Sequence, residues 1–252
     1  MVTAPPPPPP WPILVLSLTD AAGRRRAIAA QLEALGLGFI FFDAIDGRQG
    51  LAPEHEVAID RPGTAARFGR PLSDGEYACA LSHLAISRHI LDAGLPGAVV
   101  LEDDAILDPR FAEFLRAGAQ GAADLIQLDH LDARVWRFDR RRRLLPGVRL
   151  ARLAANASLT TGYAISRRAA AHLAAHALPL RGPADWPCDM TVLGAAITLP
   201  RLVDHPPEEA STLQAQRARL VAARPAERRA LRFFRRSYWR RWLFKRLTRK
   251  VS

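Results

Sequence analysis

Residues 98–104 constrain the fold of this chain more than any other stretch. Four apolar residues, two of them β-branched, lead directly into Glu102, Asp103 and Asp104. Such a short apolar run is typical of a buried strand whose far end reaches the rim of a sheet. Three neighbouring carboxylates repel one another, and a divalent cation among them would relieve that repulsion. Because oxygen ligands suit Mg²⁺ or Mn²⁺, the stretch predicts a metal site at a strand end.

A simpler role for these acids is to cap the next helix. Asp108 followed by Pro109 is typical of a helix start, with Asp108 as the N-cap. Asp108 alone would meet that need, so capping does not account for three further acids upstream.

The positive charge of the chain is concentrated near its C-terminal end. The formal net charge is +11, and residues 228–250 contain eleven Arg or Lys and no acid. The formal charges of the rest of the chain therefore sum to zero, which argues against a nucleic-acid-binding domain. We expect a proline-rich disordered leader at 1–11, a globular domain at 12–213 and a basic, aromatic-rich segment at 214–252.

The hydrophobic pattern predicts an α/β fold with a mixed, mostly parallel sheet. Strands are expected at 12–18, 39–42, 98–101, 124–128, 159–165 and 197–203. Helices are expected at 20–35, 74–93, 109–117, 167–177 and 185–195, the first capped by Thr19-Asp20 and the second by a capping box of Ser73 with Glu76. Residues 47–70 are expected to form a long loop, and residues 140–143 an exposed one.

Two cysteines, Cys79 and Cys188, have no Cys or His partner at the spacing of a structural zinc site. They indicate a reducing, cytoplasmic setting. The chain has no apolar run of 18 residues that would span a membrane.

Two motifs resemble glycosyltransferase family 25. They are Ser-Asp-Gly-Glu-Tyr-Ala-Cys-Ala-Leu-Ser-His at 73–83 and Val-Val-Leu-Glu-Asp-Asp at 99–104, and weaker similarity lies at 14–26, 42–47, 162–166, 184–186 and Ser211. The resemblance covers roughly residues 12–213. It implies a GT-A-like, Rossmann-type domain that binds a nucleotide sugar, most often UDP-galactose, and transfers the sugar with inversion. The family makes lipopolysaccharide sugars in bacteria and includes the collagen galactosyltransferases.

The resemblance also implies roles for single residues. Mn²⁺, or Mg²⁺, would be held through a D-x-D-like motif, with Asp104 as principal ligand and Glu102 acting through water or the ribose. Asp103, Ser17 and Arg25 are expected at the donor, although Ser17 stands where the family usually has Asn.

The remaining candidates each have a structural alternative. Asp185 is the expected general base, with Asp129 and Asp189 as rivals. Trp186 could offer a face to a sugar or lie in the core. Glu76, Ser82 and His83 are expected either on the acceptor side or in structural roles, and His205 is a possible late metal ligand.

The C-terminal segment combines aromatic residues with arginines, as lipid–water interfaces do. It predicts peripheral binding to the cytoplasmic face of the membrane, near a lipid-linked glycan acceptor. A helix packed on the domain and a nucleic-acid-binding tail are the alternatives. The expected membrane contacts are Phe233, Phe234, Arg235, Arg236, Tyr238, Trp239, Arg240, Arg241 and Trp242.

Three other functions are alternatives to a transferase. A dehalogenase-like phosphatase needs Thr or Val four residues after its nucleophile, but Leu107 follows Asp103 at that distance. A nucleic-acid-binding protein explains the basic tail and not the acidic strand end. A family member that keeps the fold but has lost activity and acts as a scaffold is the third alternative.

Overall fold

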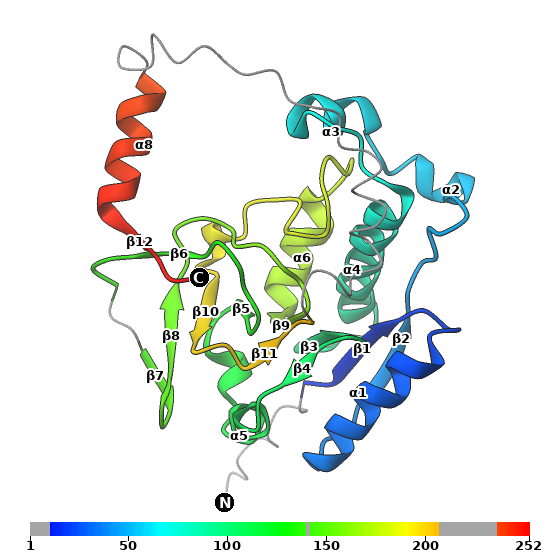
Figure 1. Ribbon diagram of the computed structural model, residues 1–252, viewed down its shortest axis with the longest axis horizontal. Helices are drawn as coiled ribbons and strands as arrows, with labels where there is room; N and C mark the ends of the chain where they lie inside the picture. Colours follow the sequence, from blue (N-terminus) through cyan, green and yellow to red (C-terminus); the bar gives the residue numbers. More distant parts are fainter. Residues whose placement is uncertain (1–10, 140–141, 207–235) are drawn as a thin grey trace, which may run out of the picture.

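The computed structural model describes residues 11–139, 142–206 and 236–252. Its centre is an eight-stranded mixed sheet with helices on both faces (Figure 1). In spatial order the strands are β2 (Ile40–Asp43), β1 (Ile13–Ser17), β3 (Gly97–Glu102), β9 (Gly162–Ser166), β5 (Leu125–Gln127), β10 (Ala196–Leu199), β8 (Val148–Arg152) and β7 (Arg142–Leu145). β9 and β8 run against the other six. The α/β fold and the mostly parallel sheet are therefore confirmed.

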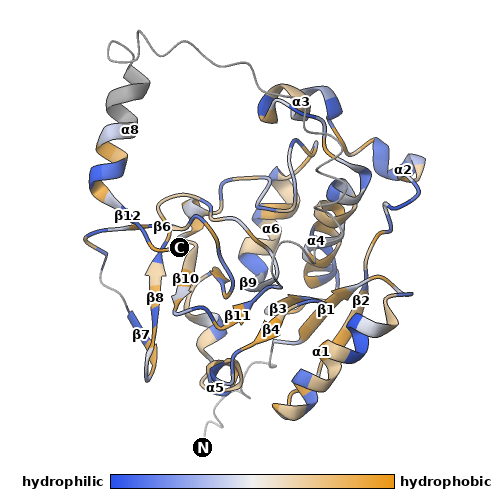
Figure 2. Ribbon diagram, viewed as in Figure 1, coloured by the Kyte–Doolittle hydropathy of each residue, from blue (hydrophilic) through white to orange (hydrophobic). Residues whose placement is uncertain are grey.

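Helices cover the two faces of this sheet as two separate cores. The larger helices are α1 (Ala22–Ala34), α4 (Asp74–Asp92), α5 (Arg110–Arg116) and α6 (Arg167–His176). Along β3, Ala98 and Val100 pack with α4 and α6, whereas Val99 and Leu101 pack with α1 and α5. The strand is apolar throughout because successive side chains point to opposite faces and both faces are buried. Figure 2 shows the same hydrophobic character along β1 and β3.

Helix α4 begins with the predicted capping box. Ser73 Oγ accepts a hydrogen bond from the Glu76 amide at 3.2 Å, and Glu76 Oε2 accepts one from the Ser73 amide at 2.9 Å. The Glu76 carboxylate is buried and also pairs with Arg70 at 2.8 Å. The structure thus gives Glu76 a structural role at the start of the helix.

The long loop predicted at 47–70 is wrong. It contains two short helices, α2 (Pro53–Glu56) and α3 (Arg61–Phe68). Asp60 caps α3 by accepting a hydrogen bond from the Gly63 amide at 2.8 Å, and each helix has proline in its first turn. Asp60 and the two prolines are ordinary helix-start signals, but a segment rich in Gly and Pro also resembles a loop.

The helix predicted at 185–195 is also wrong, because only a short 3-10 turn, η2 (Thr191–Leu193), forms there. The Asn156 side chain forms hydrogen bonds with backbone groups that would otherwise pair with each other in a helix. Its Nδ2 donates to the Cys188 carbonyl at 2.7 Å, and its Oδ1 accepts from the Met190 amide at 3.0 Å. A distant side chain has replaced the local hydrogen bonds.

Two further boundaries differ from expectation. Helix α1 has Ala21 as its N-cap without a side-chain cap, and Asp20 pairs with Arg48 instead. The strand predicted at 197–203 splits into β10, inside the sheet, and β11 (Val203–Asp204), which pairs with β4 (Ile106–Leu107). Arg142 and Arg143, expected in a loop, begin the edge strand β7, whereas 140–141 lie outside the described residues.

The last residues of the chain pack on the sheet-bearing body. Helix α8 (Arg236–Leu247) leads into β12 (Thr248–Lys250), which pairs antiparallel with β6 (Arg134–Trp136). Thr248 is buried, and the Ser252 hydroxyl lies 3.1 Å from His130 Nδ1. None of the helices in the described ranges combines the length and apolarity that crossing a membrane would require.

Candidate active site

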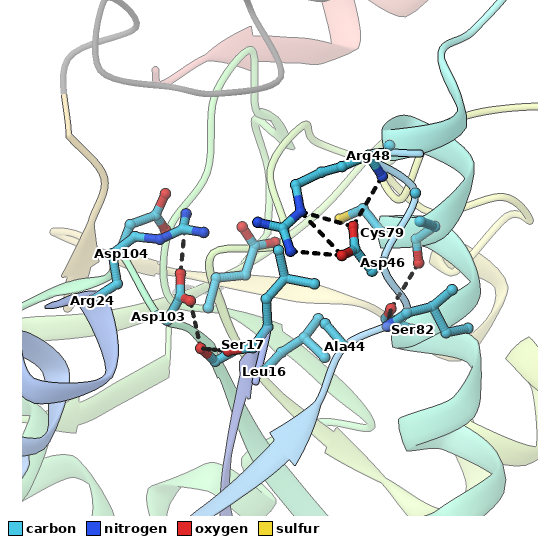
Figure 3. Close-up of a pocket in the computed structure, with 16 residues that line it drawn as sticks. Leu16, Ser17, Arg24, Ala44, Asp46, Arg48, Cys79, Ser82, Asp103 and Asp104 are labelled. Atoms are coloured by element: carbon cyan, nitrogen blue, oxygen red, sulfur yellow. Dashed lines mark hydrogen bonds and ion pairs between the residues drawn. The ribbon is translucent and has the colours of Figure 1, made fainter. Parts of the chain in front are cut away.

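A pocket of about 290 Å³ opens at the carboxyl ends of β1 and β3 (Figure 3). Its walls come from the end of β1, the first turn of α1, the segment after β2, the first turns of α4 and the acidic end of β3. The predicted residues Ser17, Ser82, Glu102, Asp103 and Asp104 all line it. The place expected for Glu102 to Asp104 is therefore confirmed.

Asp103 is held by the neighbouring strand and helix. Ser17 Oγ donates to Asp103 Oδ2 at 2.6 Å, and an Arg24 guanidinium nitrogen lies 3.3 Å from Asp103 Oδ1. Burial raises the pKa of Asp103, and the Ser17 hydrogen bond and the charge of Arg24 oppose that shift. Arg25, which we expected at the donor, donates from Nε to Ser17 Oγ at 3.2 Å and also pairs with Asp43 and the Phe41 ring. Arg24 is the α1 arginine that lines the pocket.

Asp104 differs from its neighbour because its buried Oδ1 has no hydrogen-bond partner among the described residues. Burial, followed by the charges of Glu102 and Asp103, raises the pKa of Asp104 to about 6. An ionised carboxylate with one buried oxygen that accepts no hydrogen bond is costly, and a cation is the partner that best relieves the cost. The oxygen donors of Asp104 and its neighbours fit Mn²⁺ or Mg²⁺.

Glu102 is anchored from two sides. Its Oε1 lies 3.1 Å from His83 Nε2 and accepts a hydrogen bond from Thr160 Oγ1 at 2.8 Å. Burial would raise the pKa of Glu102, but the hydrogen bonds from His83 and Thr160 hold it below its ordinary value. His83 Nδ1 contacts the buried Tyr163 hydroxyl at 2.8 Å. His83 thus links helix α4 to the acidic strand end.

The opposite side of the pocket holds a second arginine that the sequence did not single out. Arg48 lines the pocket and pairs with Asp46 and Asp20. Ser82 fixes this wall, because its hydroxyl accepts from the Ile45 amide at 2.9 Å and donates to the Ala78 carbonyl at 2.7 Å. Ser82 therefore positions the segment after β2.

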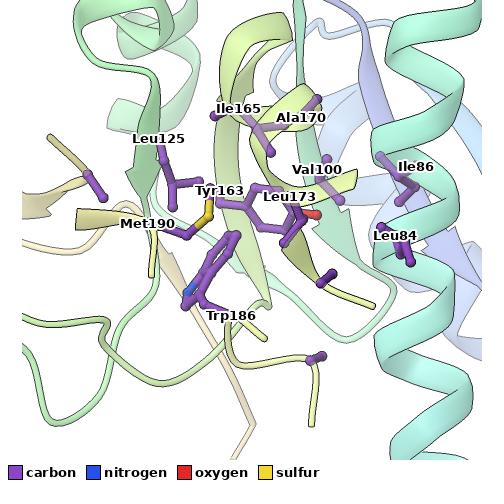
Figure 4. Close-up of a cluster of buried hydrophobic side chains, with 14 of the residues drawn as sticks. Leu84, Ile86, Val100, Leu125, Tyr163, Ile165, Ala170, Leu173, Trp186 and Met190 are labelled. Carbon is purple, nitrogen blue, oxygen red and sulfur yellow. The ribbon is translucent and has the colours of Figure 1, made fainter. Parts of the chain in front are cut away.

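Trp186 belongs to the core. It is 4% exposed and meets the Tyr163 ring edge-on at 5.1 Å (Figure 4). Of its two expected roles the structure supports the structural one, because no face of the indole is open to a sugar.

Asp185 and Asp129 occupy different surroundings. Asp185 is half-buried and accepts a hydrogen bond from the Leu159 amide at 3.1 Å. Leu159 adjoins Thr160, which contacts Glu102, so Asp185 lies at the same edge of the sheet as the pocket. Asp129 is fully buried and bound by His205 at 2.8 Å and Arg201 at 3.3 Å. Neither carboxylate lines the pocket.

The other candidates lie apart from the pocket. Asp189 is exposed and caps the turn at Thr191. Among the expected membrane contacts, Phe233, Phe234 and Arg235 lie outside the described residues, as does Ser211. Arg236, Tyr238, Trp239, Arg240 and Arg241 belong to α8 by backbone, and the Trp242 side chain is 42% exposed.

These features define an α/β protein with an acidic, arginine-flanked pocket at the carboxyl ends of parallel strands. Residues 11–191 match glycosyltransferase family 25 (LPS biosynthesis protein), and the chain belongs to this family.

Several curated proteins are similar to the chain over part of their length. The lacto-N-neotetraose biosynthesis glycosyltransferase LgtE of Neisseria meningitidis serogroup B is 40% identical over 101 residues, which span 40% of this chain and 35% of that protein. The lipooligosaccharide biosynthesis protein lic2B of Haemophilus influenzae is 28% identical over 64% of this chain and 62% of its own length. Procollagen galactosyltransferase 1 of Danio rerio is 29% identical over 64% of this chain and 28% of its own length.

Proposed function

We propose that the chain is a metal-dependent, inverting glycosyltransferase of GT-A-like fold. It would move a hexose, galactose in our proposal, from a UDP-sugar to a lipid-linked glycan such as the lipopolysaccharide core. The observation that carries the proposal is the buried Asp104 Oδ1, which has no partner among the described residues and lies beside two further acids in the pocket.

The donor would bind between the acids and the arginines. Asp104 would hold Mn²⁺ or Mg²⁺, with Asp103 and Glu102 beside it, and Arg24 and Arg48 line the same pocket. When bound, the cation would neutralise the charge that develops on the departing diphosphate. Guanidinium groups suit phosphate oxygens because they form paired, charge-assisted hydrogen bonds.

Asp185 is our proposal for the general base. Inversion requires the acceptor hydroxyl to attack opposite the leaving group while a carboxylate takes its proton. Asp185 is more accessible than Asp129. It accepts a hydrogen bond from the Leu159 amide, and the next residue, Thr160, contacts Glu102 at the pocket. Asp129 is already committed to Arg201 and His205 and better suits a positioning role.

The names of the relatives support the choice of substrates. One is a galactosyltransferase, and others act in lacto-N-neotetraose or lipooligosaccharide biosynthesis. A sugar-nucleotide donor and a bacterial surface glycan are therefore the first substrates to test.

A surface near the C-terminal end supports binding to an anionic membrane at its cytoplasmic face. Exposed apolar side chains gather where β6, β12 and α8 meet, and they are Trp136, Phe138, Trp242, Leu243 and Leu247. In the sequence, residues 228–250 include eleven basic residues. Aromatic and basic residues together suit a lipid–water interface. We propose that this surface, which we call the C-terminal apolar surface, holds the enzyme near its acceptor.

Thermal-shift measurements with a panel of nucleotide sugars test the proposed function. UDP-galactose with Mn²⁺ should raise the melting temperature, since a ligand at a hundred times its Kd stabilises a protein by about 2.7 kcal/mol. Transfer to a glycan acceptor should follow and should stop when EDTA is added. Binding of a nucleotide sugar with neither donor hydrolysis nor transfer would instead support an inactive scaffold.

A further inference from the structure

Three side chains of different chemistry converge beside the donor pocket. Cys79 and His83 lie four residues apart on one face of α4, and Glu102 ends β3. The Cys79 sulfur, a ring nitrogen of His83 and a carboxylate oxygen of Glu102 all lie within 4.8 Å of one another. His83 is buried and the other two are half-buried. The sequence places Cys79 and His83 one helical turn apart, and the fold brings Glu102 to them.

The imidazole of His83 is fixed in a ligating orientation. Its Nδ1 contacts the Tyr163 hydroxyl at 2.8 Å, and its Nε2 points to Glu102 Oε1 at 3.1 Å. The Tyr163 hydroxyl is buried and can accept a hydrogen bond from the Nδ1–H of His83. Metal-binding histidines regularly donate their second ring nitrogen to such a partner.

The distances are close to those that a small cation needs. Zinc bonds of about 2.0 to 2.3 Å in a tetrahedron place the ligand atoms roughly 3.3 to 3.7 Å apart. Glu102 and His83 already approach this spacing, and the 4.8 Å limit leaves the sulfur about 1 Å of side-chain movement to complete it. Thr160 donates to Glu102 Oε1 and steadies the carboxylate.

We propose that Cys79, His83 and Glu102 form a Zn²⁺ site that is distinct from the oxygen site at Asp104. Thiolate and imidazole ligands favour Zn²⁺, whereas carboxylates alone favour Mn²⁺ and Mg²⁺. Cys79 and Glu102 both line the pocket, so the fourth position of the ion would open into it. On binding, the thiol of Cys79 and the Nε2–H of His83 each lose a proton to solvent, so that the thiolate and the freed Nε2 lone pair ligate the ion.

The site predicts that Zn²⁺ inhibits the enzyme. A zinc ion would occupy Glu102 and place a fixed double charge next to the Asp104 site. This consequence rests on the proposed function, whereas zinc binding itself does not.

A second group of possible ligands provides a matched comparison. Asp129, Asp204 and His205 also place ligand atoms within 4.8 Å of one another. Arg201 contacts both carboxylates, and its charge disfavours a cation there. His205→Gln is therefore the histidine control, and Cys188→Ser is the thiol control.

Calorimetric titration of the full chain with Zn²⁺, without nucleotide, tests the site. We expect one zinc ion to bind at neutral pH, and Cys79→Ser and His83→Gln to weaken it by about a hundredfold. His205→Gln and Cys188→Ser should bind as the unaltered chain does. Zinc binding that is absent, or that is lost in His205→Gln instead, would overturn the proposal.

Cobalt spectroscopy of the unaltered chain covers the case in which a variant does not fold. Co²⁺ in the site should show a thiolate-to-metal charge-transfer band that Zn²⁺ displaces, and a spectrum without that band would exclude Cys79 as a ligand. Activity is measured separately at saturating Mn²⁺. A chain that binds Zn²⁺ through Cys79 but transfers no sugar keeps the zinc site and refutes the proposed function.

Discussion

Ser17 Oγ donates a 2.6 Å hydrogen bond to Asp103 Oδ2 across the ends of two parallel strands. Leu16 pairs with Glu102 in the register of β1 and β3, so Ser17, the last residue of β1, lies beside Asp103, the first residue after β3. This bond, together with Arg24, turns Asp103 toward β1. Asp104 Oδ1 is buried and has no hydrogen-bond partner among the described residues. Asp103 is therefore held by protein contacts, whereas Asp104 is available to a cation.

The first prediction concerns Asp104→Asn without metal. A carboxyl whose pKa rises to about 6 on folding destabilises the folded state increasingly as the pH rises from about 4 through 6. Removing that charge should raise the melting temperature of the metal-free protein at pH values above about 7, by about 2–4 °C for each kcal/mol relieved. Differential scanning fluorimetry with EDTA measures this shift.

The same variant should lose its response to metal. Mn²⁺ should raise the melting temperature of the unaltered chain and leave that of Asp104→Asn unchanged, and Mn²⁺-dependent UDP binding should disappear. Asp108→Asn is the matched control, since Asp108 lies nearby but pairs with Arg110. Equal stabilisation of Asp104→Asn and the unaltered chain by Mn²⁺ would remove Asp104 from the ligand set.

The second prediction separates the two candidate bases. Asp185→Asn should keep donor affinity and lose transfer by about a hundredfold or more, as expected when a general base is removed. Asp129→Asn should instead lower the melting temperature, because it removes the buried charge that pairs with Arg201 and His205. Steady-state transfer rates and donor titrations are compared for both. Loss of donor binding in Asp185→Asn would make Asp185 a binding residue.

The sequence predicted the centre of this site better than its rim. The strand ending in Glu102 and the capping box at Ser73 follow from local patterns, and both formed as expected. Arg24 and Arg25 could not be told apart, because each residue turns a helix by about 100° and the start of α1 was misplaced. Asp20, the expected cap, pairs with Arg48 from a distant loop.

Long-range contacts explain the other differences. Asn156 supports the 186–190 backbone, so no helix forms there, although local propensity allowed one. Trp186 pairs with Tyr163, which lies on another strand, and that contact places the indole in the core. Local sequence carries no signal for either contact, since each depends on which strands become neighbours.

The third prediction is a pH dependence at the C-terminal end. Burial lowers the pKa of His130, whose Nε2 donates to the Thr198 carbonyl and whose Nδ1 accepts from Ser252. The folded state therefore favours the neutral ring. The stability that His130 contributes is fully present above the pKa of about 6.5 of the unfolded chain, and it is lost as the pH falls through the lower pKa of the folded state. The free energy of unfolding should decrease below about pH 6.5.

His130→Gln measures this contribution, because the amide can still donate to Thr198. Its unfolding free energy should fall less steeply between neutral and mildly acidic pH than that of the unaltered chain. Urea unfolding at several pH values gives the two slopes. Identical slopes would show that other groups cause the acid sensitivity.

The fourth prediction concerns the C-terminal apolar surface. Phe138 and Trp242 are 85% and 42% exposed, so replacing both with Ala should leave the fold intact. The double variant should sediment less with anionic vesicles and keep its turnover on a soluble acceptor. Val57→Ala, at an apolar site 86% exposed, is the matched control. Because each basic residue near an anionic surface contributes about 1 kcal/mol, high salt should release part of the unaltered chain.

Truncation tests a different property from these surface changes. A chain ending at Ala226 loses β12, the buried Thr248 and the Ser252 contact with His130. It should therefore melt at a lower temperature as well as release from vesicles, whereas the double variant should only release. If Phe138→Ala with Trp242→Ala still sediments like the unaltered chain, the apolar side chains are not the membrane contact. If it instead unfolds, the C-terminal apolar surface belongs to the packed core.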